Sequence, residues 1–446
     1  MEDVGKRVVR ALLAGTLMWA GLTACSAART PGSLDDTVSL PAGPVRDVPA
    51  GDPVAILWDH TDDTEYLARV DPRTLDVRRE LDLGRQAIRV TSFSPDGREL
   101  VMVTSRGRVR VVDLRKGADA HRFGIDAGHV VDVAWVEDDV AVVTALRGDL
   151  TTFVRIDPRR GTVLGTEELD GTAFTFDDLE GGVVALLHPG TPGEEAPGRT
   201  TVALATSGGR VASARLDEIA SGFFLPEGED SFYTRLTPGF AVAGSEATIV
   251  GTDGTIAVVD LTDMSVEIEG RDDSLFASVA SWFVPPAHAK TAAGTHLEAQ
   301  WVGSTHLLVT GYKVDIHRES EYVVSDTATR AGAVLLDPDD WSAKVVDPEA
   351  SLAMPAGDLL LTSHELTPGD ERGAGIGLRA YDASGGRVWH RFGSQYAHVV
   401  YIDERTALVR HGWDRVLVSA VDLDTGKVLK TRELPGTFPP GGRVVR

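Results

Sequence analysis

Cysteine is nearly absent from this chain, since Cys25 is the single one among 446 residues. An intrachain disulfide is therefore impossible, and so are a thiolate metal site and a vicinal cysteine pair. Exported domains often use disulfides for stability. A chain of this length with 42% hydrophobic residues can instead bury an ordinary core.

Basic residues are in deficit, with 44 Lys and Arg against 67 Asp and Glu and a formal net charge of −23. We exclude nucleic acid as a partner, because its phosphates require a cationic surface. The same deficit argues against a polybasic contact with anionic lipid heads. We expect the acidity to keep an exported protein soluble and monomeric.

The apolar run near the N-terminus is too short to cross a membrane. Residues 11–24 read ALLAGTLMWAGLTA, about 14 residues where a spanning helix needs about 20. The run follows Lys6, Arg7 and Arg10 and ends in small residues. A basic start, a short apolar stretch and small residues at its end predict a secretory signal.

The end of this run, Leu22-Thr23-Ala24-Cys25, resembles the lipobox of bacterial lipoproteins. The resemblance implies that Cys25 takes a diacylglyceryl group on its thiol and that residues 1–24 are cleaved as the signal peptide. Two acyl chains, such as palmitate, anchor a protein stably. We therefore expect lipid anchoring at the outer, extracytoplasmic face of the cell membrane, with a plain secretory signal as the alternative. The Pro-, Gly- and Ala-rich residues 25–51 are expected to form the lipidated cysteine and a flexible linker.

From residue 52 to residue 446 the sequence predicts an all-β domain. No stretch shows a sustained helical stripe, and short runs rich in β-branched residues, such as VAILW, ELVMVTS and HLLVTGY, are bounded by Gly, Asp, Pro or Ser. Such runs are typical of many short strands.

An aspartate recurs between the last two strands of a repeated unit. The spacing is mostly in the forties, and an eighth segment, VALATSGGRVASARL, carries Ala205 in place of the aspartate. A period in the forties with four short strands per unit predicts a β-propeller. Each aspartate is expected to cap its own hairpin turn rather than to join a metal site. The seven are Asp71, Asp113, Asp157, Asp260, Asp337, Asp382 and Asp422.

Two of the units, LRAYDASGGRVW and VSAVDLDTGKVL, resemble the repeat of the pyrroloquinoline-quinone-like (PQQ-like) propellers. The segment SFSPDGRELVMVTSRGRVRVVDL is similar to the related WD40 and YVTN-type repeats. The eight units predict eight four-stranded blades, with seven as the alternative, and the 77-residue gap between Asp260 and Asp337 predicts an insertion around 282–330. The first blade lacks its own first strand, which TVSLPAG or the C-terminal GGRVVR could supply.

Enzymatic quinoproteins share this repeat, but this chain has no cysteine pair, and only Trp389 occupies the Trp position of the repeat. In that family this Trp packs between blades. The histidines His288, His296, His306 and His317 match no zinc pattern and are expected in a solvated loop. The sequence carries no Gly-x-Ser-x-Gly elbow, P-loop or His-Glu-x-x-His motif. We predict no cofactor, no metal and no catalytic residue.

Lipoprotein propellers of similar repeat include the BamB family of outer-membrane assembly factors. This likeness implies a non-catalytic binding or scaffold module for envelope proteins or wall glycan. The alternative is an extracytoplasmic hydrolase or lyase whose site is assembled from different blades at a mouth of the central channel. Carboxylates and histidines gathered at one such mouth would favour the enzyme.

Overall fold

The computed structural model describes residues 54–59, 64–85, 89–189, 198–224, 234–269, 293–303, 305–318, 324–364, 375–403, 405–412 and 417–433. These residues form strands and turns, and they contain no helix that could cross a membrane. The signal, Cys25 and the linker lie outside the described residues, as does Trp282.

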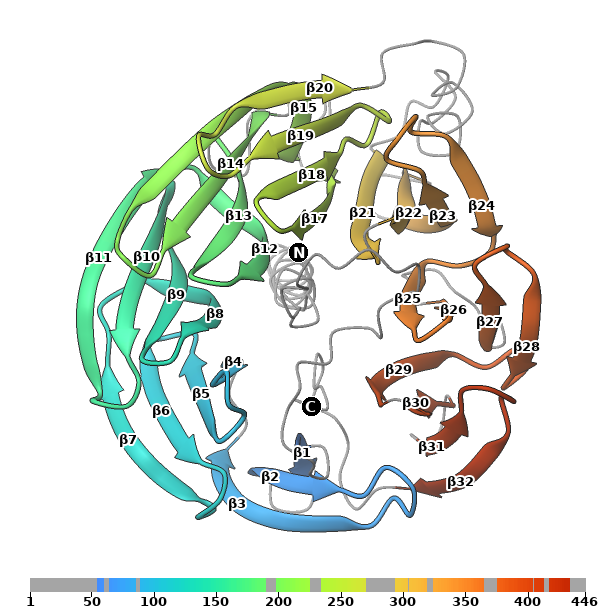
Figure 1. Ribbon diagram of the computed structural model, residues 1–446, viewed down its shortest axis with the longest axis horizontal. Coiled ribbons are helices and arrows are strands. Elements are labelled where there is room, and N and C mark those ends of the chain that lie inside the picture. The colour runs from blue at the N-terminus through green and yellow to red at the C-terminus, as the bar shows by residue number, and fades with distance from the viewer. Residues whose placement is uncertain are drawn as a thin grey trace, which may run out of the picture.

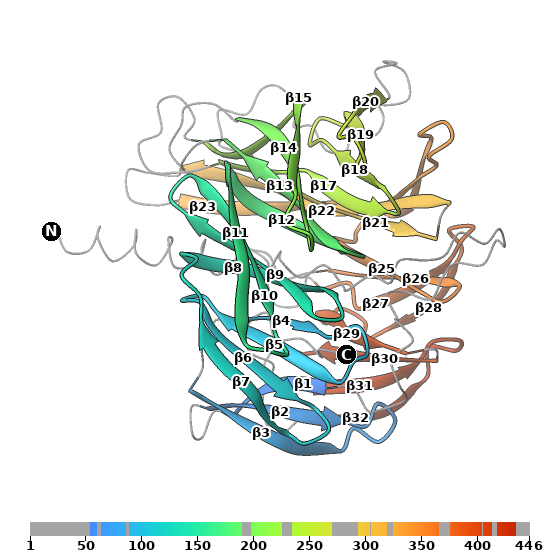
Figure 2. The same ribbon diagram turned by 60° about the vertical axis from the view of Figure 1, so that its left-hand side comes forward.

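Consecutive strands turn back on one another and form sheets arranged around a common axis (Figure 1). In Figure 2 the ring is turned so that two outer strands, β7 and β11, come forward. The first fifteen strands are β1 (Val54–Asp59), β2 (Thr64–Val70), β3 (Val77–Arg85), β4 (Arg89–Phe93), β5 (Glu99–Thr104), β6 (Arg108–Asp113), β7 (Ala118–Gly124), β8 (His129–Glu137), β9 (Val140–Arg147), β10 (Leu150–Asp157), β11 (Thr162–Asp170), β12 (Thr172–Leu179), β13 (Gly182–His188), β14 (Gly198–Thr206) and β15 (Val211–Phe224).

The second part of the chain continues in the same way. Its strands are β16 (Thr234–Thr237), β17 (Gly239–Ala243), β18 (Glu246–Val250), β19 (Ile256–Asp260), β20 (Val266–Glu269), β21 (Ala293–Val302), β22 (His306–Arg318), β23 (Val324–Leu336), β24 (Ala343–Asp347), β25 (Leu352–Ala356), β26 (Leu359–Ser363), β27 (Leu378–Asp382), β28 (Arg387–Arg391), β29 (Ala397–Ile402), β30 (Thr406–His411), β31 (Leu417–Asp422) and β32 (Val428–Glu433).

Hydrogen bonding divides these strands into seven sheets. Five have four strands in chain order, β1–β3 form a sheet of three, and one sheet has nine. The nine-stranded sheet contains β12–β15 and β21–β24, because β16 pairs antiparallel with β15 and parallel with β21. The prediction of an all-β propeller is confirmed, but the sheets are not the separate four-stranded units that were expected.

The three-stranded sheet agrees with the expectation that the first unit lacks its first strand. Asp71 follows β2, so β2 and β3 correspond to the last two strands of the other units. Both segments considered as donors of the missing strand, residues 37–43 and 441–446, lie outside the described residues.

The core lies between neighbouring sheets, and the contacts run around the whole ring. Eight hydrophobic clusters of the described residues each join two neighbouring groups of strands. One of them packs Leu408 and Val418 against Leu57 and Tyr66, so the last sheet contacts the first. Because each fully buried Leu or Val contributes roughly 1.5–3 kcal/mol, these clusters are the main stabilising term.

The range 282–330, expected as an insertion, contains regular structure. It includes β21, β22 and the first half of β23, and the hairpin of β22 and β23 is long, with 13 residues in each strand. Part of the extra length is therefore an extended hairpin. Leu297 of β21 is buried in the core, so this segment belongs to the sheet. Residues 270–292 lie outside the described part.

Candidate functional site

The seven repeated aspartates all lie at the turn between the last two strands of their units. Each carboxylate accepts a hydrogen bond from a backbone amide two to four residues ahead, which closes the turn. The donors are Arg73 and Thr74 to Asp71, Arg115 and Lys116 to Asp113, Arg160 to Asp157, Thr262 to Asp260, Asp339 to Asp337, Gly386 to Asp382 and Thr425 to Asp422.

Hydrogen bonds to the carboxylates lower the pKa of several of these aspartates. The largest cause is the backbone amide of Thr74 at Asp71 and the side chain of Thr425 at Asp422. In the eighth unit, Ala205 cannot accept such a bond. The next residue replaces it, because Thr206 Oγ1 accepts from the amide of Arg210 at 3.0 Å.

The fourth residue after the aspartate adopts a left-handed conformation in most units. Glycine occupies this position in three units, as Gly117, Gly161 and Gly426. In three others Leu75, Met264 and Trp341 occupy it with φ of 56°, 64° and 57°. Leu75 and Trp341 are buried, and Met264 packs on a core cluster. The strained backbone therefore places an apolar side chain in the core.

Five arginines bind a turn of the following sheet. Five side chains donate to a carbonyl in such a turn: Arg69 to Leu114, Arg155 to Ser207, Arg210 to Thr262, Arg391 to Gly426 and Arg432 to Leu75. Trp389 has a similar position, since its Nε1–H donates to the carbonyl of Leu423 at 2.8 Å and its ring lies over Gly426.

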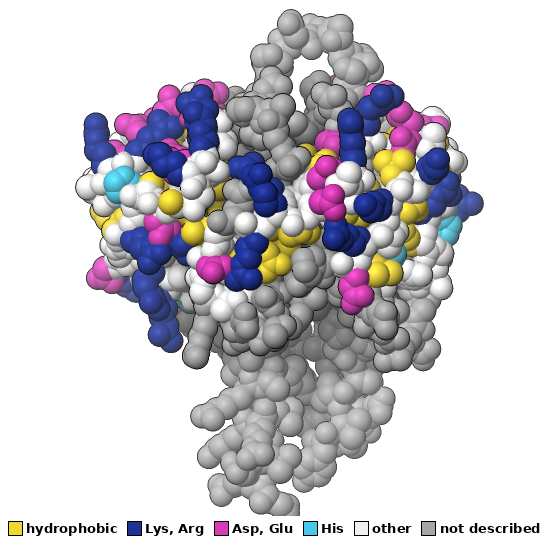
Figure 3. Space-filling view, turned by 90° about the horizontal axis from the view of Figure 1, so that it is seen from below, with side chains coloured by type: hydrophobic (Ala, Val, Ile, Leu, Met, Phe, Trp, Pro, Cys, Tyr) yellow, Lys and Arg dark blue, Asp and Glu magenta, His cyan; other side chains and the backbone are white. Residues whose placement is uncertain are grey.

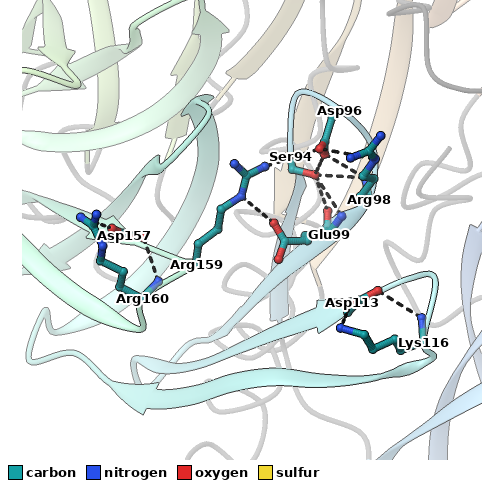
Figure 4. A network of polar contacts seen from close by, with 9 residues as sticks. All are labelled: Ser94, Asp96, Arg98, Glu99, Asp113, Lys116, Asp157, Arg159 and Arg160. Carbon is teal, nitrogen blue, oxygen red and sulfur yellow. Dashed lines mark hydrogen bonds and ion pairs between the residues drawn. The ribbon is translucent and has the colours of Figure 1, made fainter.

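Figure 4 shows one of these junctions, between the β4–β7 and β8–β11 sheets. Arg159, in the turn after Asp157, reaches back to Glu99 at 2.8 Å and to Asp96 at 3.5 Å. Asp96 also accepts from the hydroxyl of Ser94, which holds the turn before β5. A contact of this kind joins two sheets and leaves no open coordination position.

The repeated aspartates are thus distributed around the ring, one to a turn. Within the described residues no three His, Cys, Asp or Glu side chains are grouped as metal ligands. Figure 3 shows one side of the ring with basic and acidic side chains interspersed on its surface. Neither sign of charge gathers there into a continuous patch.

Two groups of charged residues involve the strands that lie nearest the axis, among them β8, β12 and β29 (Figure 1). The first is an acidic pair, Asp132 on β8 and Asp177 on β12. Asp177 accepts from the amide of Val242 on β17 at 3.1 Å, so it connects two strand groups. Oδ2 of Asp132 is buried and has no hydrogen-bond partner in the described structure. Burial, with a smaller contribution from the charge of Asp177, raises the pKa of Asp132 to about 7.

The second group lies on another part of the inner edge. His398 of β29 is paired in register with Arg410 of β30, and Glu298 of β21 is close enough to affect the charge of His398. Desolvation by the surrounding protein lowers the pKa of His398, the positive charge of Arg410 lowers it further, and Glu298 acts in the opposite direction. The two groups do not converge on one another through any contact between described residues.

Four other histidines are buried and structural. Each lies beside an aromatic ring: His188 with Phe174, His296 with Tyr312, His364 with Tyr396 and His411 with Phe392. The expectation of a solvated loop is wrong for His296, because β21 carries it into the sheet interior, where it is 8% exposed. The side chains of His288 and His317 lie outside the described part.

The sequence analysis did not identify the charged residues near the inner strands. Asp132, Asp177, His398 and Arg410 belong to no repeated motif, and only the arrangement of β8, β12, β29 and β30 brings each group together. Alternation along an inner strand could have marked them, since a charged residue stands there among apolar ones.

The architecture and its inner edge define the chain as a β-propeller. No model of a known protein family and no curated protein matches it. Among solved structures it is similar to the dihydro-heme d1 dehydrogenase NirN in complex with DHE, with a TM-score of 0.55 and 14% identity, over 91% of this chain and 79% of that one.

Two further structures are similar. The computationally designed Ika8 protein has a TM-score of 0.50 and 12% identity, over 89% of this chain and 98% of that one. Apo AztD from Citrobacter koseri has a TM-score of 0.47 and 11% identity, over 86% and 95%. At such identities a likeness shows the fold alone.

Proposed function

We propose that the protein is a lipid-anchored, extracytoplasmic β-propeller that acts as a non-catalytic binding or scaffold module for envelope proteins or wall glycan. The lipobox-like Leu22-Thr23-Ala24-Cys25 supports the anchor, and the linker to residue 51 would hold the ring clear of the membrane. We assign it to the PQQ-like, BamB-like propellers as a monomer that binds no nucleic acid.

The inner edge is the observation that carries a binding role. Its charged residues form two separate groups, and neither contains a nucleophile hydrogen-bonded to a base, which covalent catalysis requires. A rigid ring that presents isolated charged groups on its inner strands is suited to holding a ligand.

We also propose that the ring has eight blades. The support is that the eight hydrophobic clusters separate eight groups of strands, if β12–β15 and β21–β24 are each counted as a blade. The short β16 would then be a bridge within one continuous sheet.

Asp132 supports the second candidate function, an extracytoplasmic hydrolase or lyase. A carboxylic acid with a pKa near 7 beside a second carboxylate has the property of a general acid or base. If this role exists, Asp132→Asn abolishes turnover of glycan or ester substrates and leaves the crosslinked partner unchanged.

The first experiment is crosslinking in cells followed by purification from membranes, with Cys25→Ser as the control. Wild-type protein is expected in the membrane fraction with a stoichiometric envelope protein or glycan, whereas Cys25→Ser is released. Membrane association without any partner would refute the scaffold role. Membrane retention of the Cys25→Ser variant would refute the lipid anchor.

A further inference from the structure

Arg410 is a half-buried cation that none of the described acidic side chains neutralises. No hydrogen bond or ion pair joins its guanidinium to another described residue, and burial lowers its pKa. Other partly buried arginines differ: Arg379 contacts Asp347 at 3.0 Å and Glu349 at 2.6 Å. Acidic residues far outnumber basic ones in this chain, so an arginine without an acidic partner among the described residues is unexpected and points to a binding role.

His398 lies beside Arg410 on the neighbouring strand. The two residues are directly opposite in the β29–β30 pairing, so their side chains are on the same face of the sheet. The side chain of His398 is exposed, although the surrounding protein lowers its pKa. Together the pair offers a planar guanidinium and an imidazole donor a short distance apart.

The alternation of β30 shows which way this pair points. Ala407, Val409 and His411 face the β25–β28 sheet, where His411 stacks on Phe392. Leu408 faces the β1–β3 sheet and packs on Leu57 there. Arg410 is two residues from Leu408, so it shares the face toward the three-stranded sheet, which has no described inner strand to cover it.

We propose that Arg410 and His398 form a binding site for an oxyanion, a carboxylate or a phosphate group, at the inner edge of the ring. This inference rests on the proposed binding function and names the chemistry of its ligand. The guanidinium binds either anion through two parallel hydrogen bonds, and the imidazole supplies a third donor. The negative charge of Glu298 acts on His398 and disfavours an anion bound there, so the ligand is expected against Arg410.

The test uses the full-length lipidated protein in detergent, titrated with sodium phosphate and, separately, sodium acetate at constant ionic strength. Binding is measured by isothermal titration calorimetry and by NMR of the ring resonances of isotope-labelled histidine. We expect binding that weakens as the pH rises, because His398 loses its proton while Arg410 keeps its charge. Tighter binding of phosphate would indicate a phosphate ligand, and tighter binding of acetate a carboxylate.

Matched variants separate the site from the general charge. Arg410→Gln is expected to weaken binding about tenfold or more, the effect of one lost charged hydrogen bond. His398→Gln should remove the pH dependence, and Arg410→Lys should restore part of the affinity. The control is Arg405→Gln, an exposed arginine of the same sheet that contacts Asp424.

The proposal is refuted if wild-type protein binds neither anion, or if Arg405→Gln weakens binding as much as Arg410→Gln. If Arg410→Gln fails to fold, the other two variants decide the question. The proposal is also refuted if Arg410→Lys and His398→Gln both bind the anions with the affinity of the wild type. The crosslinking experiment is independent. A captured partner without anion binding would leave the scaffold role and reject this site.

Discussion

Replacement of Gly426 by alanine tests whether the turns and the neighbouring sheets are locked together. Gly426 has a φ of 63°, and a Cβ added to it would lie 2.5 Å from Cδ2 of Trp389. The left-handed backbone costs an alanine about 1 kcal/mol, and overpacking adds roughly 1–3 kcal/mol. Gly426→Ala should therefore lower the free energy of unfolding by about 2–4 kcal/mol, measured by urea denaturation with tryptophan fluorescence.

Gly244→Ala is the matched control, because it separates the backbone cost from the contact. Gly244 has a φ of 58°, and nothing lies within 4 Å of an added Cβ. This variant should lose only about 1 kcal/mol. In a Trp389→Leu background, the loss of unfolding free energy caused by Gly426→Ala should also fall to about 1 kcal/mol. Equal losses for the two glycines in the wild-type background would refute the reasoning.

Three further predictions concern single side chains, each read from urea unfolding. Leu75→Gly should be less destabilising than Leu75→Ala by about 1 kcal/mol, the reverse of the usual order, because glycine relieves the positive φ of 56°; the usual order would contradict the strain. The raised pKa of Asp132 means that the folded state binds an extra proton, so stability is lost as the pH rises from about 4 to about 7. Asp132→Asn should remove this loss, on the order of 2–4 kcal/mol, and match wild type near pH 4, whereas the exposed Asp358→Asn should keep the wild-type profile. Asp347 is fully buried and accepts from Arg379 and from Thr362, so Asp347→Asn should cost about 3–5 kcal/mol; a loss as small as that of Asp358→Asn would show that the pair is not buried in solution.

The fold class could be predicted because its signals are local and repeated. An apolar strand, an aspartate and a turn recur often enough to identify the propeller, and the three-stranded first unit followed from the same pattern. The nine-stranded sheet could not be predicted, because β16 pairs with strands on two different units through three and two residue pairs. Pairings of only two or three residues are too short to leave a periodic pattern in the sequence.

The inner edge was missed for a related reason. Asp132 and Asp177 are 45 positions apart, and His398 meets Glu298 only because both strands lie at the axis. The amino-acid composition of the strands reveals neither of these two proximities. The error at His296 has a different cause: Thr295 and Glu298 beside it are polar and were interpreted as part of a loop, whereas Thr295, His296 and Leu297 are all buried in β21. A strand that buries polar residues cannot be distinguished from a polar loop by composition alone.

The five contacts of an arginine with the turn of the following sheet have a consequence for how the ring closes. Within the chain they span 35 to 52 residues, but the contact of Arg432 with Leu75 spans 357. Loop-closure entropy grows with the logarithm of the span, so this last junction costs about 2 kcal/mol more to form than its equivalents. The ring therefore has a seam whose weakness comes from connectivity rather than from chemistry. A circular permutation that joined the two ends and cut the chain between two other sheets would make the junction of those two sheets the weakest one.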